Sequence, residues 1–494
     1  MAKETLIYQL EHFGFRYPKN EKQTLENINL EVREGDFVLL CGVSGSGKTT
    51  LLRHLKPSLA PYGVSAGEIH YGFDARDGRI EAGYVGYVQQ NPENQVVTDK
   101  VWHELAFGLE SLGIPNQEIR RRVAEVASFF GIESWYHKKT NELSGGQMQK
   151  LNLASALVMK PKVLVLDEPT SFLDPIAASD FLQTLVKINR ELGTTIVMTE
   201  HRPDDVLSYA SKVVVMEDGK ILMSGSPEEI AVSLHHMRHP LLHAMPAPFR
   251  IWSDCDGKSA HVPLTVKDGR QWLGDVCESQ EQRSCVRTWT HESAARCPDD
   301  HPAVHANNIW YRYKEEGRDT LKEFQLSLGK GEILVLMGGN GVGKSTILKI
   351  LAGIYKPHRG SVVTDGKIGY MPQNPELLFL KKTVREDLYD TLKYSNSKNQ
   401  KPEEIAKFLG IEDLWDRHPY DLSGGEQHKA ALAKILLYEP DILLLDEPTK
   451  GLDAGFKKEF SEILRELKKR GKSILMTGHD TEFCADIADR CAMI

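Results

Sequence analysis

The sequence lacks a long apolar run, a closely spaced cysteine pair and an excess of positive charge. Its longest apolar stretches, such as 37–43 and 333–337, fall far short of the roughly 18 to 20 residues that cross a bilayer. The start, MAKETLIYQL, has no basic region followed by an apolar core, so we expect a cytoplasmic protein. The seven cysteines contain no CxxC pair, which argues against a disulfide framework or a zinc site. The formal charge of -8 gives no support for nucleic-acid binding.

One sequence pattern occurs twice along the chain, in two similar copies. Lys344 follows Lys48 by 296 residues within matching glycine loops, whereas Ser423 follows Ser144 by 279 residues within matching LSGG segments. The second copy is therefore 17 residues shorter between these two points, as surface loops permit. We place the first copy at 1–230, an accessory and linker region at 231–302, and the second copy at 303–494.

The order of elements within each copy predicts an α/β fold. Short Val, Ile and Leu runs alternate with helical stretches, which is typical of a mainly parallel sheet. Residues 96–150 and 380–430 are expected to be mostly helical, and strand-like pieces are expected near 262–266. By its offset the second copy stops at the equivalent of Met216, so we expect its closing strand hairpin to be missing.

Each copy contains a glycine loop between an apolar strand and a helical run, the context that GxxxxGK[ST] requires. Backbone N–H groups of such a loop wrap phosphate oxygens, the lysine neutralises charge and the hydroxyl reaches Mg²⁺. A glycine-rich turn without a ligand is the alternative. The residues expected to bind nucleotide are Gly42, Ser44, Gly45, Gly47, Lys48, Thr49 and Thr50 in the first loop, and Gly338, Asn340, Gly341, Gly343, Lys344, Ser345 and Thr346 in the second.

Two apolar strands end in paired acids, at Asp167-Glu168 and at Asp446-Glu447. The aspartates are expected to belong to the Mg²⁺ shell, and the glutamates to polarise a water for attack on the γ-phosphate. Helix capping by these acids is the alternative, because Pro169 follows in one copy and Pro448 in the other.

The segments Leu143 to Gln147 and Leu422 to Glu426 read LSGGQ and LSGGE, and each precedes a long helix. Lying between a phosphate loop and a DE strand, they resemble the signature of ABC ATPases. With them, both halves resemble ABC ATPase domains, a P-loop NTPase fold with a helical subdomain, over nearly their whole length.

Other residues match further motifs of that family. Gln90 and Gln373 resemble the Q-loop glutamine that touches Mg²⁺ and the attacking water, with Gln89 as a rival for Gln90. His201 and His479 resemble the switch histidines, which a structural role could also explain. The segments 171–174 and 450–453 resemble D-loops. Tyr17 and Tyr313 match the aromatic that stacks on adenine, or else are ordinary strand aromatics.

The resemblance implies that two ABC domains meet head to tail and share two ATP sites. Each site would combine one copy's motifs with the other copy's LSGG segment. Mg²⁺ would be bound by Thr49, Gln90 and Asp167, or by Ser345, Gln373 and Asp446. Because no key residue is missing, we predict that both sites hydrolyse ATP. The LSGG partners would be Ser423 and Gly425 for the first phosphate loop, and Ser144 and Gly146 for the second.

The transport system is suggested by finer resemblances. NPENQ at 91–95, ExAFG at 104–108 and TEHR at 199–202 resemble the ATPases of energy-coupling factor importers. The stretch 263–272 resembles fused ATPases assigned to hydroxymethylpyrimidine or thiamine uptake, although Trp272 could instead anchor a small core. The implied partners are a transmembrane scaffold and a substrate-binding membrane subunit, at the cytoplasmic face of the membrane. The alternative is a ribosome-acting tandem ABC protein, whose long charged helical linker is not seen here.

Overall fold

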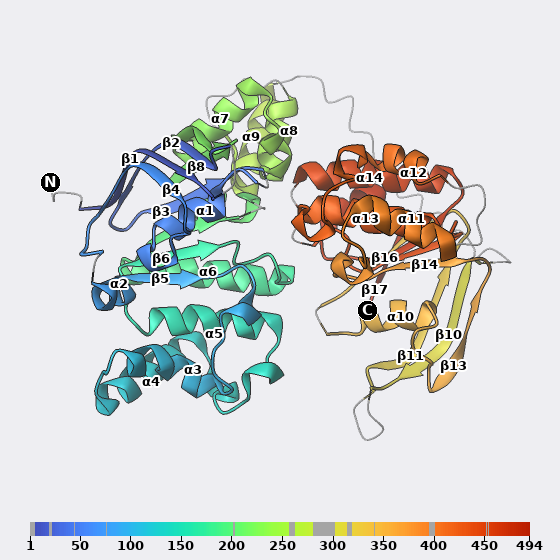
Figure 1. Ribbon diagram of the computed structural model, residues 1–494, viewed down its shortest axis with the longest axis horizontal. Helices are drawn as coiled ribbons and strands as arrows, with labels where there is room; N and C mark the ends of the chain where they lie inside the picture. The colour runs from blue at the N-terminus through green and yellow to red at the C-terminus, as the bar shows by residue number, and fades with distance from the viewer. Residues whose placement is uncertain are drawn as a thin grey trace. The chain divides into compact units, whose positions relative to one another are not determined.

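The computed structural model divides the chain into two compact units (Figure 1). The described residues up to 279 belong to unit 1, and those from 302, apart from Ala454 and Gly455, belong to unit 2. The ranges that the structure describes are 5–18, 22–43, 45–75, 77–200, 203–255, 262–279, 302–313, 319–339, 341–394, 401–450, 452 and 454–494.

The core of unit 1 is a six-stranded sheet in the order β5-β6-β7-β3-β8-β9. All neighbouring strands run parallel except β8 and β9, which form an antiparallel hairpin. Strands β3, β6 and β7 are buried along their whole length, which explains their continuous apolar sequences. The strands are β3 (Phe37–Cys41), β5 (Val85–Val88), β6 (Val163–Asp167), β7 (Thr195–Thr199), β8 (Lys212–Glu217) and β9 (Lys220–Gly225).

A smaller antiparallel sheet in the order β2-β1-β4 lies beside this core in unit 1. Its strands are β1 (Leu6–Arg16), β2 (Leu25–Arg33) and β4 (Val64–Tyr71). Along β2, buried Leu25, Ile28, Leu30 and Val32 share one face with their polar neighbours on the other. The apolar face packs on the parallel sheet, with Val38, Leu40 and Val165 in the same cluster.

Residues 101–157 form the expected helical subdomain of unit 1. Figure 1 shows α3, α4 and α5 grouped together, away from the antiparallel sheet. Their apolar faces join one core, which also includes Leu39, Leu164 and Ile196 of the parallel sheet. The α-helices between residues 48 and 192 are α1 (Lys48–His54), α2 (Gly78–Tyr84), α3 (Val101–Ser111), α4 (Asn116–Phe130), α5 (Gly145–Leu157) and α6 (Pro175–Leu192).

The described part of the accessory region is helical, so the prediction of strand-like pieces near 262–266 is wrong. Helices α7 (Pro227–Met237), α8 (Ala247–Asp254) and α9 (Val266–Ser279) contribute side chains to the same apolar core as the rest of unit 1. Thr265 begins α9 with a capping box, in which its Oγ1 accepts from Asp268 N and the Asp268 carboxylate accepts from Thr265 N. This local pairing overrides the strand preference of Val262 and Val266.

Unit 2 repeats the design with a five-stranded parallel sheet in the order β14-β15-β16-β12-β17 and an antiparallel sheet in the order β11-β10-β13. Its strands are β10 (Val304–Tyr311), β11 (Leu321–Leu328), β12 (Ile333–Met337), β13 (Arg359–Thr364), β14 (Ile368–Met371), β15 (Ile442–Leu445), β16 (Ser473–Thr477) and β17 (Arg490–Met493). Its helices are α10 (Lys344–Leu351), α11 (Val384–Tyr394), α12 (Pro402–Leu409), α13 (Gly424–Leu436), α14 (Ala454–Lys469) and α15 (Thr481–Ile487).

The two units differ at one sheet edge. In unit 1, β8 pairs with β3 and is followed by the edge strand β9. In unit 2, β17 pairs with β12 and is itself the edge strand among the residues described. No helix within the described ranges is both long and apolar enough to cross a membrane. Both units thus present the predicted α/β architecture, with the phosphate loop and the paired acids at the same end of the parallel strands.

Candidate functional site: two phosphate loops and their acids

Each phosphate loop connects a central buried strand to a helix. Lys48 opens α1, is buried, and its Nζ donates to the carbonyl oxygens of Gly42 and Val43, both at 2.9 Å. Lys344 opens α10 and donates in the same way to Gly338 and Gly339, again at 2.9 Å. The ammonium groups therefore lie inside their loops, where a phosphate would be neutralised. Ser44 and Asn340 lie outside the described residues.

Glycine is required at two positions of the first loop. A Cβ on Gly42, whose φ is +150°, would lie 2.2 Å from the carbonyl oxygen of Met216. A Cβ on Gly47, whose φ is +94°, would lie 2.9 Å from the carbonyl oxygen of Thr24. Residues that carry a side chain rarely adopt either of these backbone conformations. The loop shape is thus set by close backbone approach, which leaves its N–H groups available to a ligand.

The expected Mg²⁺ ligands come together in both units. Thr49 Oγ1 donates to Asp167 Oδ1 at 3.1 Å, and Ser345 Oγ donates to Asp446 Oδ1 at 3.0 Å. Burial raises the pKa of both aspartates, and a bound cation would favour their ionised forms. A hydroxyl, a carboxylate and a glutamine amide form an oxygen donor set that suits Mg²⁺. When bound, Mg²⁺ would neutralise phosphate charge.

The glutamates meet the Q-loop glutamines. Gln90 Nε2 donates to Glu168 Oε2 at 2.5 Å, and Gln373 Nε2 donates to Glu447 Oε2 at 2.9 Å. Gln89 instead donates its backbone N–H to Gln95 Oε1, so Gln90 is the glutamine whose side chain reaches the acid. These pairs place an acid and an amide where one water molecule could contact both.

The second glutamate is also bonded to its histidine. His479 Nε2 lies 2.8 Å from Glu447 Oε1 and 3.0 Å from Lys344 Nζ. Although burial alone would raise it, the His479 hydrogen bond and the charge of Lys450 lower the pKa of Glu447 to about 2. The carboxylate is therefore ionised at neutral pH, as a proton acceptor must be. The first histidine, His201, lies outside the described residues.

Two threonines complete the acid sites, and sequence reasoning missed them. Thr199 Oγ1 donates to Asp167 Oδ1 at 3.0 Å and accepts from Glu168 N at 2.9 Å. Thr477 makes the same two bonds to Asp446 and Glu447, at 2.9 and 2.8 Å. A signal was available, because each threonine stands two residues before the switch histidine of its copy.

The two tyrosines lie close to the helices that follow the phosphate loops. Tyr17 OH is 3.2 Å from Thr50 Oγ1, and Tyr313 OH is 2.7 Å from Thr346 Oγ1. Tyr17 is half-buried, whereas Tyr313 is exposed. Each ring is thus tied by its hydroxyl to the start of a phosphate-loop helix, a place from which it could stack on a base.

The LSGG segments act locally as helix starts. Ser144 Oγ accepts from Gln147 N at 3.3 Å to begin α5, and Ser423 Oγ accepts from Glu426 N at 3.4 Å to begin α13. In each case the residue at the third helical position bonds back to the serine N–H. Gly146 and Gly425 lie in these first turns, and neither segment bonds the phosphate loop of its own unit among the hydrogen bonds described.

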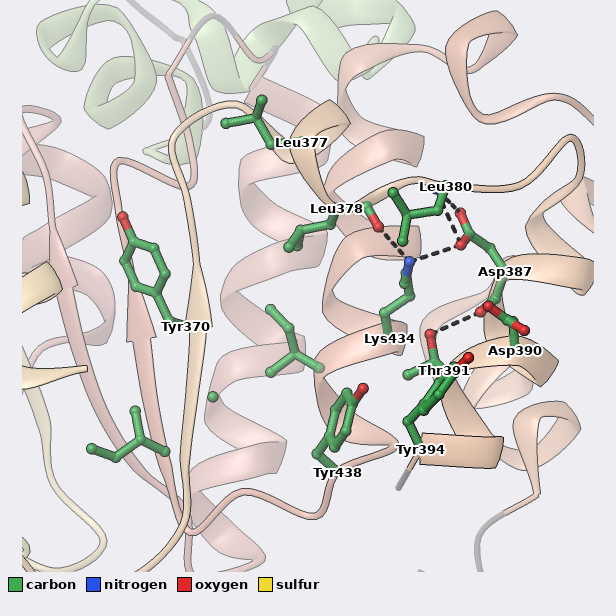
Figure 2. Close-up of a pocket in the computed structure, with 13 residues that line it drawn as sticks. Tyr370, Leu377, Leu378, Leu380, Asp387, Asp390, Thr391, Tyr394, Lys434 and Tyr438 are labelled. Atoms are coloured by element: carbon green, nitrogen blue, oxygen red, sulfur yellow. Dashed lines mark hydrogen bonds and ion pairs between the residues drawn. The ribbon is translucent and has the colours of Figure 1, made fainter. Parts of the chain in front are cut away.

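A groove of about 520 Å³ lies beside the Q-loop of unit 2 (Figure 2). Its floor holds a buried ion pair, Lys434 Nζ to Asp387 Oδ1 at 2.8 Å, and Lys434 also donates to the carbonyl oxygen of Leu378. Leu380 N donates to both Asp387 carboxylate oxygens, at 3.3 and 3.2 Å. The rim is apolar, and its most exposed side chains are Leu377 (71%), Leu380 (79%) and Tyr394 (73%).

The equivalent loop of unit 1 is anchored without a lysine. Buried Glu104 accepts from Val97 N at 3.1 Å, from Thr98 N at 2.8 Å and from Thr98 Oγ1 at 2.9 Å. Gln95 bonds back to Gln89 and Tyr87. Gln95 and Glu104 thus stabilise the loop from within, and the exposed side chains near them include the apolar Val97 and Phe107.

Two phosphate loops, each with its own acid pair, glutamine and signature helix, define a tandem P-loop ATPase. A family model described as "ABC transporter" matches residues 25–171 and 321–450. A Bacillus cereus protein named "Putative ABC transporter ATP-binding protein" is 39% identical over 98% of this chain and 89% of its own length. A Methanosarcina acetivorans protein of the same name is 32% identical over 98% of this chain and 84% of its own length.

The chain belongs to the ABC transporter family of ATP-binding proteins. It is accordingly an ABC ATPase that uses ATP with Mg²⁺. A solved structure of the archaeal ribosome recycling factor aABCE1, in complex with ribosomal stalk protein aP1, is also similar. That chain is 22% identical with a TM-score of 0.61, over 98% of this chain and 87% of its own length, and it shows a shared fold.

Proposed function

We propose that this chain is the ATP-hydrolysing subunit that energises uptake of a vitamin-like or other micronutrient through an energy-coupling factor importer. It would dock on the cytoplasmic face of the membrane, against a transmembrane scaffold subunit, with the cargo bound by a separate small membrane subunit. The observation that carries the proposal is the apolar groove beside the Q-loop of unit 2, because that loop also reaches the catalytic centre through Gln373.

The groove has the chemistry of a helix-binding surface. Exposed leucines and tyrosines line the edge of the groove. An apolar patch exposed on a protein surface is typical of a binding site. Beneath them, the Lys434 and Asp387 pair fixes the loop, so that the leucines are held in place. An apolar helix bound in this groove would contact the loop that carries Gln373. Its position would then depend on whether nucleotide is bound at the site that Gln373 reaches.

The sequence supports the importer class. NPENQ, ExAFG and TEHR resemble the ATPases of energy-coupling factor importers, and the relatives over 98% of the chain carry the name of transporter ATP-binding proteins. Within the proposal, each ATP would lie between one copy's phosphate loop and the other copy's LSGG segment. ATP would favour the closed pair through its differential affinity, and hydrolysis would release it.

The test is affinity capture of the tagged chain from detergent-solubilised membranes, with mass spectrometry of partners and bound small molecules. We expect one multi-span scaffold and one small membrane protein. Substituting Leu377→Glu together with Leu380→Glu should lower scaffold recovery roughly tenfold or more, since charges would enter an apolar interface. Tyr62→Glu, at an exposed residue of unit 1, is the matched control and should retain it. Recovery of ribosomes in place of membrane proteins would support a ribosome-acting ATPase instead.

A further inference from the structure

The two D-loops differ in their first residue. The residue three positions after the catalytic glutamate is Ser171 in unit 1 and Lys450 in unit 2. The backbone is the same at both places, because the N–H of each residue donates to the carbonyl of its glutamate at 3.2 Å. Only the side chains therefore differ.

The two side chains bond different parts of their glutamates. Ser171 Oγ donates to the backbone carbonyl oxygen of Glu168 at 3.0 Å. Lys450 Nζ reaches the carboxylate itself, 3.2 Å from Glu447 Oε2. The pair is mostly removed from solvent, with side-chain exposures of 22% for Lys450 and 9% for Glu447. An ion pair in such a place is screened little by water.

Lys450 joins a carboxylate that is already well supplied with donors. Glu447 Oε2 also accepts from Gln373 Nε2, and Oε1 lies 2.8 Å from His479 Nε2 and 3.8 Å from Lys344 Nζ. A water that gives its proton to Glu447 must displace or share one of these contacts. In hydrolysis the water oxygen bonds the γ-phosphorus, the bond from that phosphorus to the bridging oxygen of ADP breaks, and the water proton passes to the carboxylate.

We propose that Lys450 is a positioning residue that occupies Glu447 Oε2 and so makes the second ATP site hydrolyse more slowly than the first. The first site has an uncharged serine at this position, directed at the backbone. Both sites still hydrolyse ATP, at unequal rates. The inference concerns the ATPase itself and rests on the assignment of Glu447 as proton acceptor, whichever membrane partner the chain has.

The experiment isolates the second site with Glu168→Gln and then changes Lys450. In that background, Lys450→Ser should raise kcat roughly threefold to tenfold, a gain of the size that one charge-assisted contact supplies. KM for ATP should stay the same, because Lys450 contacts the carboxylate. Lys450→Arg keeps the positive charge and should keep kcat low.

The reciprocal transplant tests the same idea in unit 1. In a Glu447→Gln background, Ser171→Lys should lower kcat. An unchanged or lower kcat in Lys450→Ser, with an unchanged unfolding temperature, would overturn the proposal. Residual hydrolysis by the Glu168→Gln/Glu447→Gln double variant would instead show that the glutamates are wrongly assigned, so the two failures are distinguishable.

Discussion

In both units the glutamate of the paired acids has a backbone conformation that non-glycine residues rarely adopt. The φ angles are 45° for Glu168 and 46° for Glu447. Such a conformation costs on the order of 1–3 kcal/mol and persists only where neighbours hold it. Here the neighbour is a threonine on the next strand, Thr199 or Thr477, whose hydroxyl bonds both the aspartate and the glutamate N–H. The threonine therefore fixes the direction in which the acid leaves its strand.

Glu200 is a buried acid found in unit 1 only, since Gly478 occupies the equivalent place. Its Oε1 accepts from Thr170 Oγ1 at 2.8 Å and from Thr170 N at 3.2 Å. Burial raises the pKa of this carboxyl from 4.5 to about 8. It therefore keeps its proton at neutral pH in the folded protein, whereas in an unfolded chain it would be ionised.

We expect Glu200→Gln to stabilise unit 1 increasingly as pH rises from 5 to 8. Above its ordinary pKa, the unfolded state loses the proton while the folded state retains it, so folding becomes less favourable by up to about 1.4 kcal/mol per pH unit. Glutamine stays uncharged and keeps an oxygen for Thr170. Urea unfolding of both proteins at several pH values measures the difference, and a constant difference across this range would contradict the protonated state.

At the scale of elements, the loop after each Q-loop is held by the first turn of the next helix. Glu104 near the start of α3 and Asp387 near the start of α11 each accept backbone N–H groups of that loop. Unit 2 adds Lys434 from α13, which ties the loop and two helices together. The groove of unit 2 is thus more rigidly built than its position in a loop suggests.

Removing one member of this buried pair should be costly. Asp387→Ala would leave the Lys434 charge without its carboxylate, and the expected loss of unfolding free energy is about 3–5 kcal/mol. Asp387→Ala combined with Lys434→Met removes the unpaired charge and should restore much of that loss. Chemical denaturation of the single and double variants gives the coupling energy. Equal stability of the Asp387→Ala protein and its parent would show that the pair does not hold the loop.

At the scale of the whole molecule, ATP is expected to favour one arrangement of the two units over others. A ligand shifts such an equilibrium only by its differential affinity. We expect ATP to make the Glu168→Gln/Glu447→Gln variant more compact, since binding persists while hydrolysis is blocked. Small-angle X-ray scattering with and without ATP measures this change. The Lys48→Ala/Lys344→Ala protein is the control, and an ATP-dependent change in it would assign the effect to something other than these loops.

The sequence alone determined the architecture and the inventory of motifs. Glycine loops, DE strands and LSGG segments are short, and their chemistry requires fixed residue types at fixed spacing, so two copies could be aligned by offset. The α/β fold with two P-loop domains was confirmed. The prediction of strand-like pieces near 262–266 was wrong. Thr265 and Asp268 form a helix cap there, which the pattern of apolar residues does not reveal.

Only the tertiary structure decided which side chains meet across elements. The bonds of Thr199 and Thr477 depend on the register between neighbouring strands, and Lys434 meets Asp387 across 47 residues of sequence. Trp272 proved to be buried in the same apolar cluster of unit 1 as Phe249 and Trp252. The contact of Lys450 with Glu447 follows from the turn after β15, where a side chain three residues onward folds back on the acid. The contacts of the two threonines and of Lys434 are set by packing between distant segments, which residue spacing does not encode.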